Sequence, residues 1–264
     1  MSNFHFKKSL GQNFLHNPKV LERIASFGKI TENDVVIEIG CGNGSLTEYI
    51  LNFNPKKLIV WELDERCLDL MQEKLKNHKN FTKIEAIHKD ALLLDVPSLK
   101  LETLPIIISN LPYSVGSRIF INLLSQINSI KLMILMFQKE VAARIVAKNN
   151  SKDYSIFSVM SQLVSSCKIE FDVSPKNFTP IPKVMSSIIS CKNINANITQ
   201  ESFNFILEQG KYLFSNRRKM IRSYCKHWNL NLLDLYGAMR VENLTPQQIM
   251  FCILESKSFN KIDI

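Results

Sequence analysis

The chain has 264 residues, and its hydrophobic fraction of 45% is enough for a sizeable core in one large domain, with or without a small appendage. No apolar run approaches the roughly 18 residues that cross a bilayer, and the N-terminus has no apolar signal-peptide segment. These features argue against a membrane or secreted protein and predict a cytoplasmic one, while the formal charge of +9 favours a polyanionic partner, nucleic acid before an acidic membrane.

Strand-like and helical patterns alternate from about residue 20 to residue 137. Apolar runs typical of buried strands occur at residues 34–40, 57–64, 82–91, 105–110 and 131–137. The i, i+3, i+4 spacing of amphipathic helices occurs between them, at residues 45–53, 66–78 and 117–127. This alternation predicts a doubly wound, parallel α/β sheet of the Rossmann-like type.

The pattern changes in the second half of the chain. Two further helices are expected at 139–148 and 154–166, followed by a closing pair of strands at 167–174 and 184–192. Residues 193–200 are polar and linker-like, and four helical patterns follow, at 200–214, 217–228, 232–239 and 246–257. The sequence therefore predicts an α/β domain over residues 1–194 and a small all-helical domain over residues 195–264.

A glycine loop follows the first predicted strand in "VVIEIGCGNGSLT". Gly40, Gly42 and Gly44 would let the backbone approach a ligand and adopt conformations closed to other residues. The spacing is not the G-x-G-x-x-G of dinucleotide-binding folds; it matches the G-x-G-x-G loop of methyltransferases that bind S-adenosylmethionine. Glu62 ends the second strand, where a carboxylate can accept both hydrogen bonds of a ribose diol, and Asp90 ends the third, within reach of an adenine amino group.

The fourth strand ends in "NLPY", residues 110–113, which reads first as a turn. At the same sheet edge as the glycine loop and the acids, it resembles the N-L-P-Y motif of the adenine-N6 methylases of ribosomal RNA. Other segments are similar to that family in the same order: "KKSLGQNFL" at 7–15, "FTPIPKVMSS" at 178–187 and "FSNRRKMIRS" at 214–223. The resemblance spans nearly the whole chain. Departures from it at Ser9, Leu10, Cys41, Met185 and Ile221 remove no group that the chemistry needs.

The resemblance implies a class I methyltransferase that uses S-adenosylmethionine to dimethylate two adjacent adenosines in the 3′-terminal hairpin of 16S rRNA, in the 30S particle. It assigns the cofactor site to Asn13, Leu15, Gly40, Gly42, Gly44, Glu62, Asp90 and Asn110. Asn110 and Leu111 would accept hydrogen bonds from the adenine amine, Pro112 would keep the segment rigid, and Tyr113 would stack on the base. Phe178 would form a second aromatic wall or, equally well, a hydrophobic anchor for its loop; Tyr113 could also be purely structural.

Basic residues cluster at Lys7–Lys8, at Lys139 with Arg144, and most densely at Arg217, Arg218, Lys219, Arg222 and Lys226. The last cluster predicts contacts with RNA phosphates, and a plain solvated helix face is the alternative. Six cysteines and five histidines form no CxxC, metal-ligand or triad pattern, so neither a metal site nor a disulfide framework is expected, and the thiols are expected to be reduced and mostly buried.

Two other functions remain open at this point. One is a large-subunit rRNA adenine methylase of the macrolide-resistance type, and the other is a non-catalytic RNA-binding assembly factor. An intact glycine loop, both strand-end acids and "NLPY" favour an enzyme over the second. The chain is expected to act as a monomer.

Overall fold

The computed structural model describes residues 4–7, 10–224 and 236–259. By its internal contacts the chain divides into two units. The sheet unit comprises Met1–Ala142 and Cys167–Asn193, and the helical unit comprises Ala143–Ser166 and Ile194–Ile264. The predicted boundary at residue 194 differs from this division in one respect, because residues 143–166 pack with the C-terminal helices.

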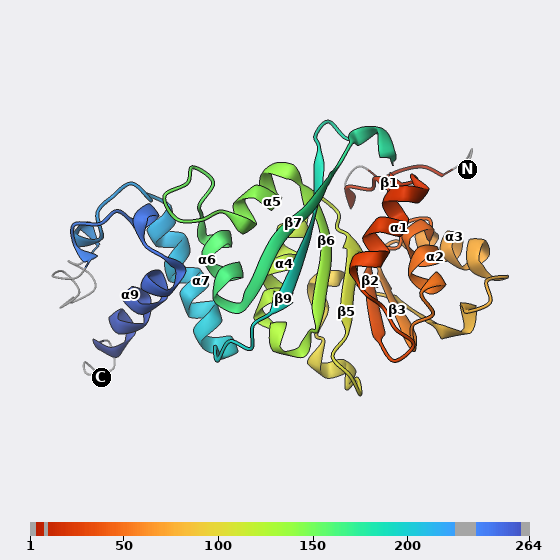
Figure 1. The fold of residues 1–264 in the computed structure, drawn as a ribbon, viewed down its shortest axis with the longest axis horizontal. Helices are drawn as coiled ribbons and strands as arrows, with labels where there is room; N and C mark the ends of the chain where they lie inside the picture. Colours follow the sequence, from red (N-terminus) through yellow and green to blue (C-terminus); the bar gives the residue numbers. More distant parts are fainter. Residues whose placement is uncertain (1–3, 8–9, 225–235, 260–264) are drawn as a thin grey trace. The chain divides into compact units, whose positions relative to one another are not determined.

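A seven-stranded sheet forms the centre of the sheet unit, with the strand order β4-β3-β2-β5-β6-β9-β7 (Figure 1). Its strands are β2 (Val35–Ile39), β3 (Lys57–Glu62), β4 (Ile84–His88), β5 (Ile106–Asn110), β6 (Leu132–Gln138), β7 (Ser165–Val173) and β9 (Ser186–Asn193). Strands β2 to β6 pair in parallel, and β9 runs antiparallel to β6. This confirms the doubly wound α/β sheet, with both closing strands at one edge.

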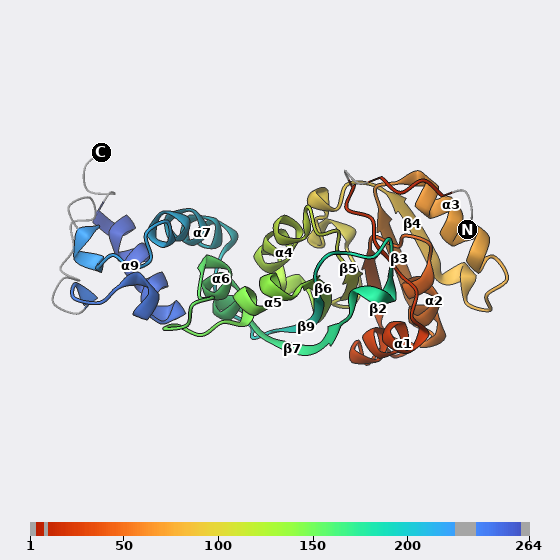
Figure 2. The same ribbon diagram turned by 90° about the horizontal axis from the view of Figure 1, so that it is seen from above.

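Helices cover both faces of the sheet because the central strands are apolar on both faces. On one face α1 (Pro18–Phe27), α2 (Ser45–Asn52) and α3 (Glu65–Leu75) share a core with alternate residues of the strands. On the other face α4 (Gly116–Ser125) packs Phe120 edge-on against Phe137 of β6. Figure 2 shows the helices α2 and α4 from above.

Two elements near the N-terminus are absent from the sequence predictions. Helix α1 begins after Asn17, whose side chain accepts hydrogen bonds from the amides of Lys19 and Val20, with Pro18 in the first turn. That cap-and-proline signal could have located it. Strands β1 (Phe14–Leu15) and β8 (Phe178–Thr179) form a separate antiparallel pair, which no local pattern encodes because its partners lie more than 160 residues apart.

The helical unit is built from α6 (Ile156–Val164), α7 (Gln200–Phe214) and α9 (Pro246–Phe259), and α5 (Lys139–Val146) crosses the division between the units. Single-turn 3-10 helices are Phe81–Lys83, Ala91–Leu93, Pro97–Leu99, Ile127–Ser129, Pro175–Asn177, Ile221–Ser223 and Val241–Asn243.

The helix predicted over residues 217–228 is wrong where it is described. Residues 216–219 form a turn, Met220 makes an isolated bridge with Arg240, and the 3-10 helix Ile221–Ser223 follows. In the helix predicted at 232–239, Tyr236 is helical, residues 237–239 form a turn and bend, and residues 225–235 lie outside the described part. The apolar residues of 217–224 have helical spacing. The backbone of Met220 nevertheless pairs with that of Arg240, 20 residues further along the chain, and does not continue a helix.

The expectation that all cysteines are reduced is also wrong. Cys167 of β7 and Cys191 of β9 form a disulfide between neighbouring strands of the sheet. Cys41 and Cys67 are free and buried, Cys252 is buried as well, and Cys225 lies outside the described residues. The sequence separation of 24 carries no pairing signal, because only the placement of the two strands side by side in the sheet brings the sulfur atoms together.

Among the described residues, none of the helices combines the length and the apolar character needed to span a bilayer.

Candidate active site

The carboxyl ends of the parallel strands open into a cavity within the sheet unit. Its walls come from the loop after β2, from the end of β3, from the segments that follow β4 and β5, and from residues 10–15 of the N-terminal segment. Of the predicted cofactor and catalytic residues, the lining includes Asn13, Leu15, Gly40, Gly42, Glu62, Asp90, Asn110, Leu111, Pro112 and Tyr113. Gly44 and Phe178 are not among the lining residues.

The glycine loop turns sharply because three of its residues have positive φ angles. Gly40, Gly42 and Gly44 have φ of 76°, 55° and 74°. A Cβ on Gly42 would lie 2.9 Å from the Phe14 ring, and a Cβ on Gly44 would lie 3.0 Å from the Met71 Cα. Gly42 therefore permits the N-terminal segment to lie on the loop, whereas Gly44 permits α3 to pack against the start of α2 and does not reach the cavity.

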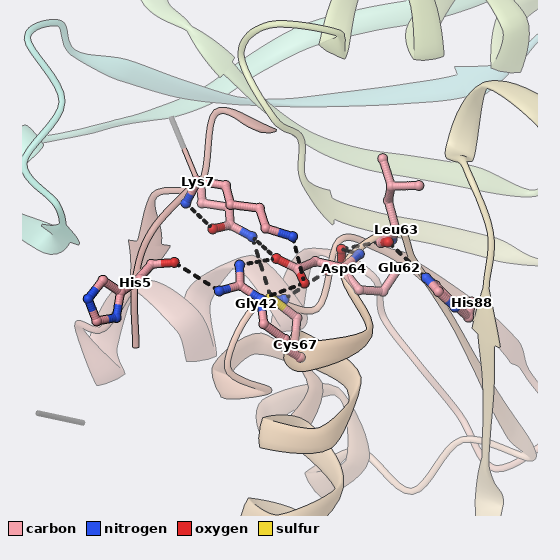
Figure 3. Close-up of polar contacts among 10 residues, drawn as sticks. His5, Lys7, Gly42, Glu62, Leu63, Asp64, Cys67 and His88 are labelled. Carbon is pink, nitrogen blue, oxygen red and sulfur yellow. Dashed lines mark hydrogen bonds and ion pairs between the residues drawn. The ribbon is translucent and has the colours of Figure 1, made fainter. Parts of the chain in front are cut away.

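The Glu62 carboxylate is fixed by backbone amides (Figure 3). Its Oε1 accepts hydrogen bonds from the amides of Leu63 at 2.8 Å and Asp64 at 2.9 Å, and its Oε2 accepts one from Gly42 at 3.3 Å. These three amides, together with the Cys41 thiol at 3.8 Å from Oε2, hold the carboxylate in one orientation beside the glycine loop. Its remaining acceptor positions suit a diol that presents two hydroxyl donors.

Asp90 is anchored in a similar way at the next strand end. Its Oδ1 accepts a hydrogen bond from the Leu92 amide at 2.9 Å and so caps the 3-10 helix Ala91–Leu93. No other described residue donates to its side chain, so Oδ2 remains available as an acceptor at the cavity wall. Asp90 and Glu62 thus present two oriented acceptors on the same rim.

The amide of Asn110 has a fixed orientation at the end of β5. Its Nδ2 donates to the backbone carbonyl of Asn13 at 3.0 Å, and no described residue donates to its Oδ1. The carbonyl of Pro112 accepts from the Gly116 amide at 2.8 Å, which closes a rigid turn. Because the donor end of the amide is occupied, Asn110 offers its oxygen to whatever enters the cavity.

Tyr113 lines the cavity with its hydroxyl tethered. The hydroxyl and the Ser186 Oγ share a hydrogen bond of 2.5 Å, which connects the segment after β5 to the start of β9. Burial raises the pKa of Tyr113, so the phenol is neutral at physiological pH. The ring is therefore held in place at the cavity wall by a partner 73 residues away.

Phe178 has the second of the two roles left open for it. It is 1% exposed, belongs to the hydrophobic core and pairs with Leu15 through the β1–β8 bridge. The expected aromatic wall is therefore corrected to a hydrophobic anchor, which ties the loop 178–187 to the N-terminal segment. Aromatic character alone could not distinguish the two, because both roles require an apolar ring.

The N-terminal segment is held over the glycine loop by one buried carboxylate, Asp64 (Figure 3). Gln12 Nε2 donates to Asp64 Oδ2 at 2.8 Å, and Gln12 Oε1 accepts from the Lys7 amide at 2.8 Å. Arg66 donates to both Asp64 oxygens, at 2.9 and 2.6 Å, and reaches the carbonyl of His5 at 3.1 Å. We call Gln12, Asp64 and Arg66 the N-terminal clasp. The clasp is absent from the sequence predictions, although the second acid of "WELD" was a visible signal.

The basic residues of the helical unit do not behave as one patch. Arg217 Nη1 donates to the carbonyls of Lys152 and Tyr154, and its Nε lies 3.4 Å from a Glu242 oxygen. In contrast, Arg218, Lys219 and Arg222 are exposed and have no ion-pair partner among the described residues. Of the other predicted clusters, Lys7 pairs with Asp64 and Lys139 with Asp172, while Lys8 and Lys226 lie outside the described residues.

The comparisons with known proteins decide what kind of site this is. Residues 3–256 match the family model described as ribosomal RNA adenine dimethylase. The chain belongs to that family. The ribosomal RNA small subunit methyltransferase A of Wolbachia sp. subsp. Brugia malayi is 38% identical to it, over 94% of this chain and 95% of the relative. The protein of that name from Sulfurihydrogenibium sp. is 35% identical, over 92% and 93%.

Solved structures share the fold of this methylase. A dimethyladenosine transferase from Plasmodium falciparum aligns with a TM-score of 0.79 and 25% identity, over 95% of this chain and 98% of that one. The 23S rRNA methyltransferase ErmE aligns with a TM-score of 0.65 at 20% identity, over 92% and 99%. The protein is thus an S-adenosylmethionine-dependent rRNA adenine dimethyltransferase with a Rossmann-like sheet.

One buried group of the methylase has no role in these contacts. Glu38 of β2 is 0% exposed, and neither of its carboxyl oxygens has a hydrogen-bond partner in the described part of the chain. Burial, with a smaller contribution from the nearby Glu62 charge, raises the pKa of Glu38 to about 8. Glu38 is therefore mostly protonated at neutral pH, beneath the glycine loop.

This predicts a pH-dependent stability that Glu38→Gln removes. The folded protein holds a proton that the unfolded chain releases above pH about 4.5, so Glu38 stabilises the fold fully at low pH and progressively less as pH rises toward about 8. Between these limits the free energy of unfolding of the wild type should fall relative to the variant by about 1.4 kcal/mol per pH unit. Urea unfolding of both proteins from pH 5 to pH 8 measures it, and parallel pH curves would contradict a protonated Glu38.

Proposed function

We propose that this methylase transfers methyl groups to N6 of two adjacent adenosines in the 3′-terminal hairpin of 16S rRNA, in the 30S particle and in the cytoplasm, as a monomer. The names of the relatives at 35–39% identity support the small subunit as the target, since each is a ribosomal RNA small subunit methyltransferase A. The likeness to ErmE, at 20% identity, extends to the fold alone.

The observation that carries the proposed chemistry is the orientation of Asn110. An adenine amine is a poor nucleophile because its lone pair is delocalised into the ring. We propose that Asn110 Oδ1, left free by the Nδ2 bond to Asn13, and the Leu111 carbonyl accept hydrogen bonds from the N6 hydrogens. This favours a tetrahedral nitrogen whose lone pair points at the methyl group, and positioning of this kind supplies much of the rate.

The cavity fits the methyl donor through acceptors that match its nucleoside. S-Adenosylmethionine supplies an electrophilic methyl group on a sulfonium. We assign the ribose diol to the amide-held Glu62 carboxylate and the adenine amine to the free oxygen of Asp90. Asn13 and Leu15, held by the Asn110 bond and by the β1–β8 pair, would close over the bound cofactor. No strong base is needed, because transfer of the methyl group with cleavage of its bond to the sulfonium would leave N6 positively charged and acidic enough to release its proton to water.

The target base has to leave its stack to reach this cavity. We propose that the tethered Tyr113 ring receives it and that stacking offsets the unstacking cost of a few kcal/mol. Arg218, Lys219 and Arg222, which are exposed and unpaired with acids in the described structure, would contact RNA phosphates. Arg217, predicted with them, instead holds backbone carbonyls.

The test is methylation of purified immature 30S particles beside free large-subunit RNA. We expect methyl incorporation into 30S alone, and dimethyladenosine by mass spectrometry in rRNA from cells that contain the protein but not from cells that lack it. Incorporation into large-subunit RNA only would assign the enzyme to the macrolide-resistance type. Binding of RNA without incorporation into either substrate would support the non-catalytic factor instead.

A further inference from the structure

A second cavity lies entirely within the helical unit, away from the residues assigned so far to catalysis. It is lined by the end of the loop before α6, by the last turn of α7 with the turn that follows, and by Arg144 of α5. The lining residues that matter here are Arg144, Lys152, Asp153, Ser155, Lys211 and Arg217. We call it the basic cavity.

The charges of the basic cavity are unbalanced. Arg144, Lys152 and Lys211 are exposed, and none of the described carboxylates lies within ion-pair distance of them. Asp153 is the only acid among the lining residues, against four cations. The Arg144 guanidinium lies over the Phe157 ring, 5.2 Å from its centroid, which restricts its motion. Positive charge is thus concentrated in a concave site in which three of the four cations have no ion-pair partner in the described structure.

Arg217 fixes the loop that lines one side of the basic cavity. One of its nitrogens donates to two carbonyls of the loop, those of Lys152 and Tyr154, while its Nε is near the Glu242 carboxylate. The buried Tyr154 hydroxyl donates to the Leu244 carbonyl at 2.9 Å and fixes the same loop from below. The loop that presents Lys152 and Ser155 is therefore held in place before any ligand arrives, which lowers the entropic cost of binding.

Ser155 supplies the observation that points to the ligand. It is the N-cap of α6 and forms a capping box with Ser158, whose hydroxyl accepts from the Ser155 amide at 3.0 Å; the Ser155 hydroxyl is buried, and its own hydrogen has no acceptor in the described structure. A buried donor without an acceptor is costly. The N-terminus of a helix attracts anions, because its first amides and its dipole favour negative charge. A small anion with several acceptor oxygens would satisfy the hydroxyl, the helix terminus and the three free cations together.

We infer that the basic cavity binds a phosphate group of the RNA backbone. This inference rests on the proposed function for the source of the phosphate. Arg144, Lys152 and Lys211 would neutralise it and Ser155 would donate a hydrogen bond, while Arg217 keeps the loop in place. The site would supply affinity and register without reading sequence, as backbone contacts do.

Inorganic phosphate tests the site without RNA. Titration of the full chain, followed by backbone amide shifts, should give a saturable shift at Ser155 and Ile156. The shift should be lost in Lys152→Gln/Lys211→Gln and kept in Lys148→Gln/Lys192→Gln, a control that removes the same charge from exposed positions outside the basic cavity. No saturable shift in the wild type, or an equal shift in both variants, would overturn the site.

RNA binding at several salt concentrations then identifies the source of the phosphate. With a small-subunit hairpin, the cavity variant should bind about tenfold more weakly than the control, and the slope of log affinity against log salt should be smaller by about one. A phosphate shift with RNA affinity equal to that of the control would make this a free-phosphate site and overturn the RNA assignment. Methylation of 30S by the wild type is scored separately, so failure of the proposed function would leave the phosphate titration standing.

Discussion

Asn110→Ala should reduce methyl transfer by at least about 10²-fold while RNA binding stays close to that of the wild type. The substitution removes the oxygen that we assign to the adenine amine, and misplacement of a reacting group by about 1 Å already costs that much. It also removes the Nδ2 bond to the Asn13 carbonyl. Single-turnover incorporation into 30S particles at saturating cofactor separates the chemical step from cofactor binding. Near-wild-type turnover would refute the role of Asn110.

Asn110→Asp is the matched control for this prediction. It keeps an acceptor oxygen at the same position, but it replaces the donor to Asn13 with an oxygen that faces the Asn13 carbonyl and adds a negative charge, so it should retain measurable transfer and show its defect mainly in the cofactor KM. If Asn110→Asp were as inactive as Asn110→Ala, the bond to Asn13, and not the free oxygen, would carry the effect.

Asp64→Ala should release the N-terminal clasp. Asp64 is 4% exposed and accepts from Gln12 and Arg66, so its removal leaves both donors without their buried partner, at a cost of about 1–3 kcal/mol. The expected result is a rise of about tenfold in the KM for S-adenosylmethionine, with a smaller change in kcat, and faster hydrogen exchange of amides in residues 10–15. These residues line the cavity, and the Gln12 bond to Asp64 ties them to the segment after β3.

Asp69→Ala serves as the control, since Asp69 is exposed on the same helix α3. Asp64 precedes that helix but makes no side-chain cap bond, so helix content by circular dichroism should be equal in both variants. Hydrogen bonds from Arg66 hold the pKa of Asp64 well below its usual range. The Asp64 carboxylate therefore stays ionised above pH about 4. The rise in KM caused by Asp64→Ala should then be the same at every pH from 5 to 8. An unchanged KM and unchanged exchange would show that the segment is held by other contacts.

The residues of the cavity illustrate what could be predicted from sequence. Gly40, Glu62, Asp90 and Asn110 each follow a strand that its apolar pattern identifies, and parallel strands bring their carboxyl ends to one edge. The convergence of these residues at one rim therefore follows from the apolar patterns of the strands and from the rule that parallel strands end at the same edge of a sheet. Residues 217–224 show that a local pattern can mislead. Their apolar spacing predicts a helix, but Met220 instead forms a bridge with Arg240.

The sequence by itself determined the doubly wound sheet, the site at its carboxyl edge and the resemblance to rRNA adenine methylases, because strand and helix periodicity and short motifs are local properties. Only the tertiary structure decided that Phe178 is a core anchor, that Asp64 holds the N-terminal segment, that Arg217 supports a loop, and that Cys167 pairs with Cys191. Each of these depends on partners between 24 and 163 residues away, as in the register Leu15 with Phe178. Such contacts are set by how the elements pack, and no local pattern in the chain records them.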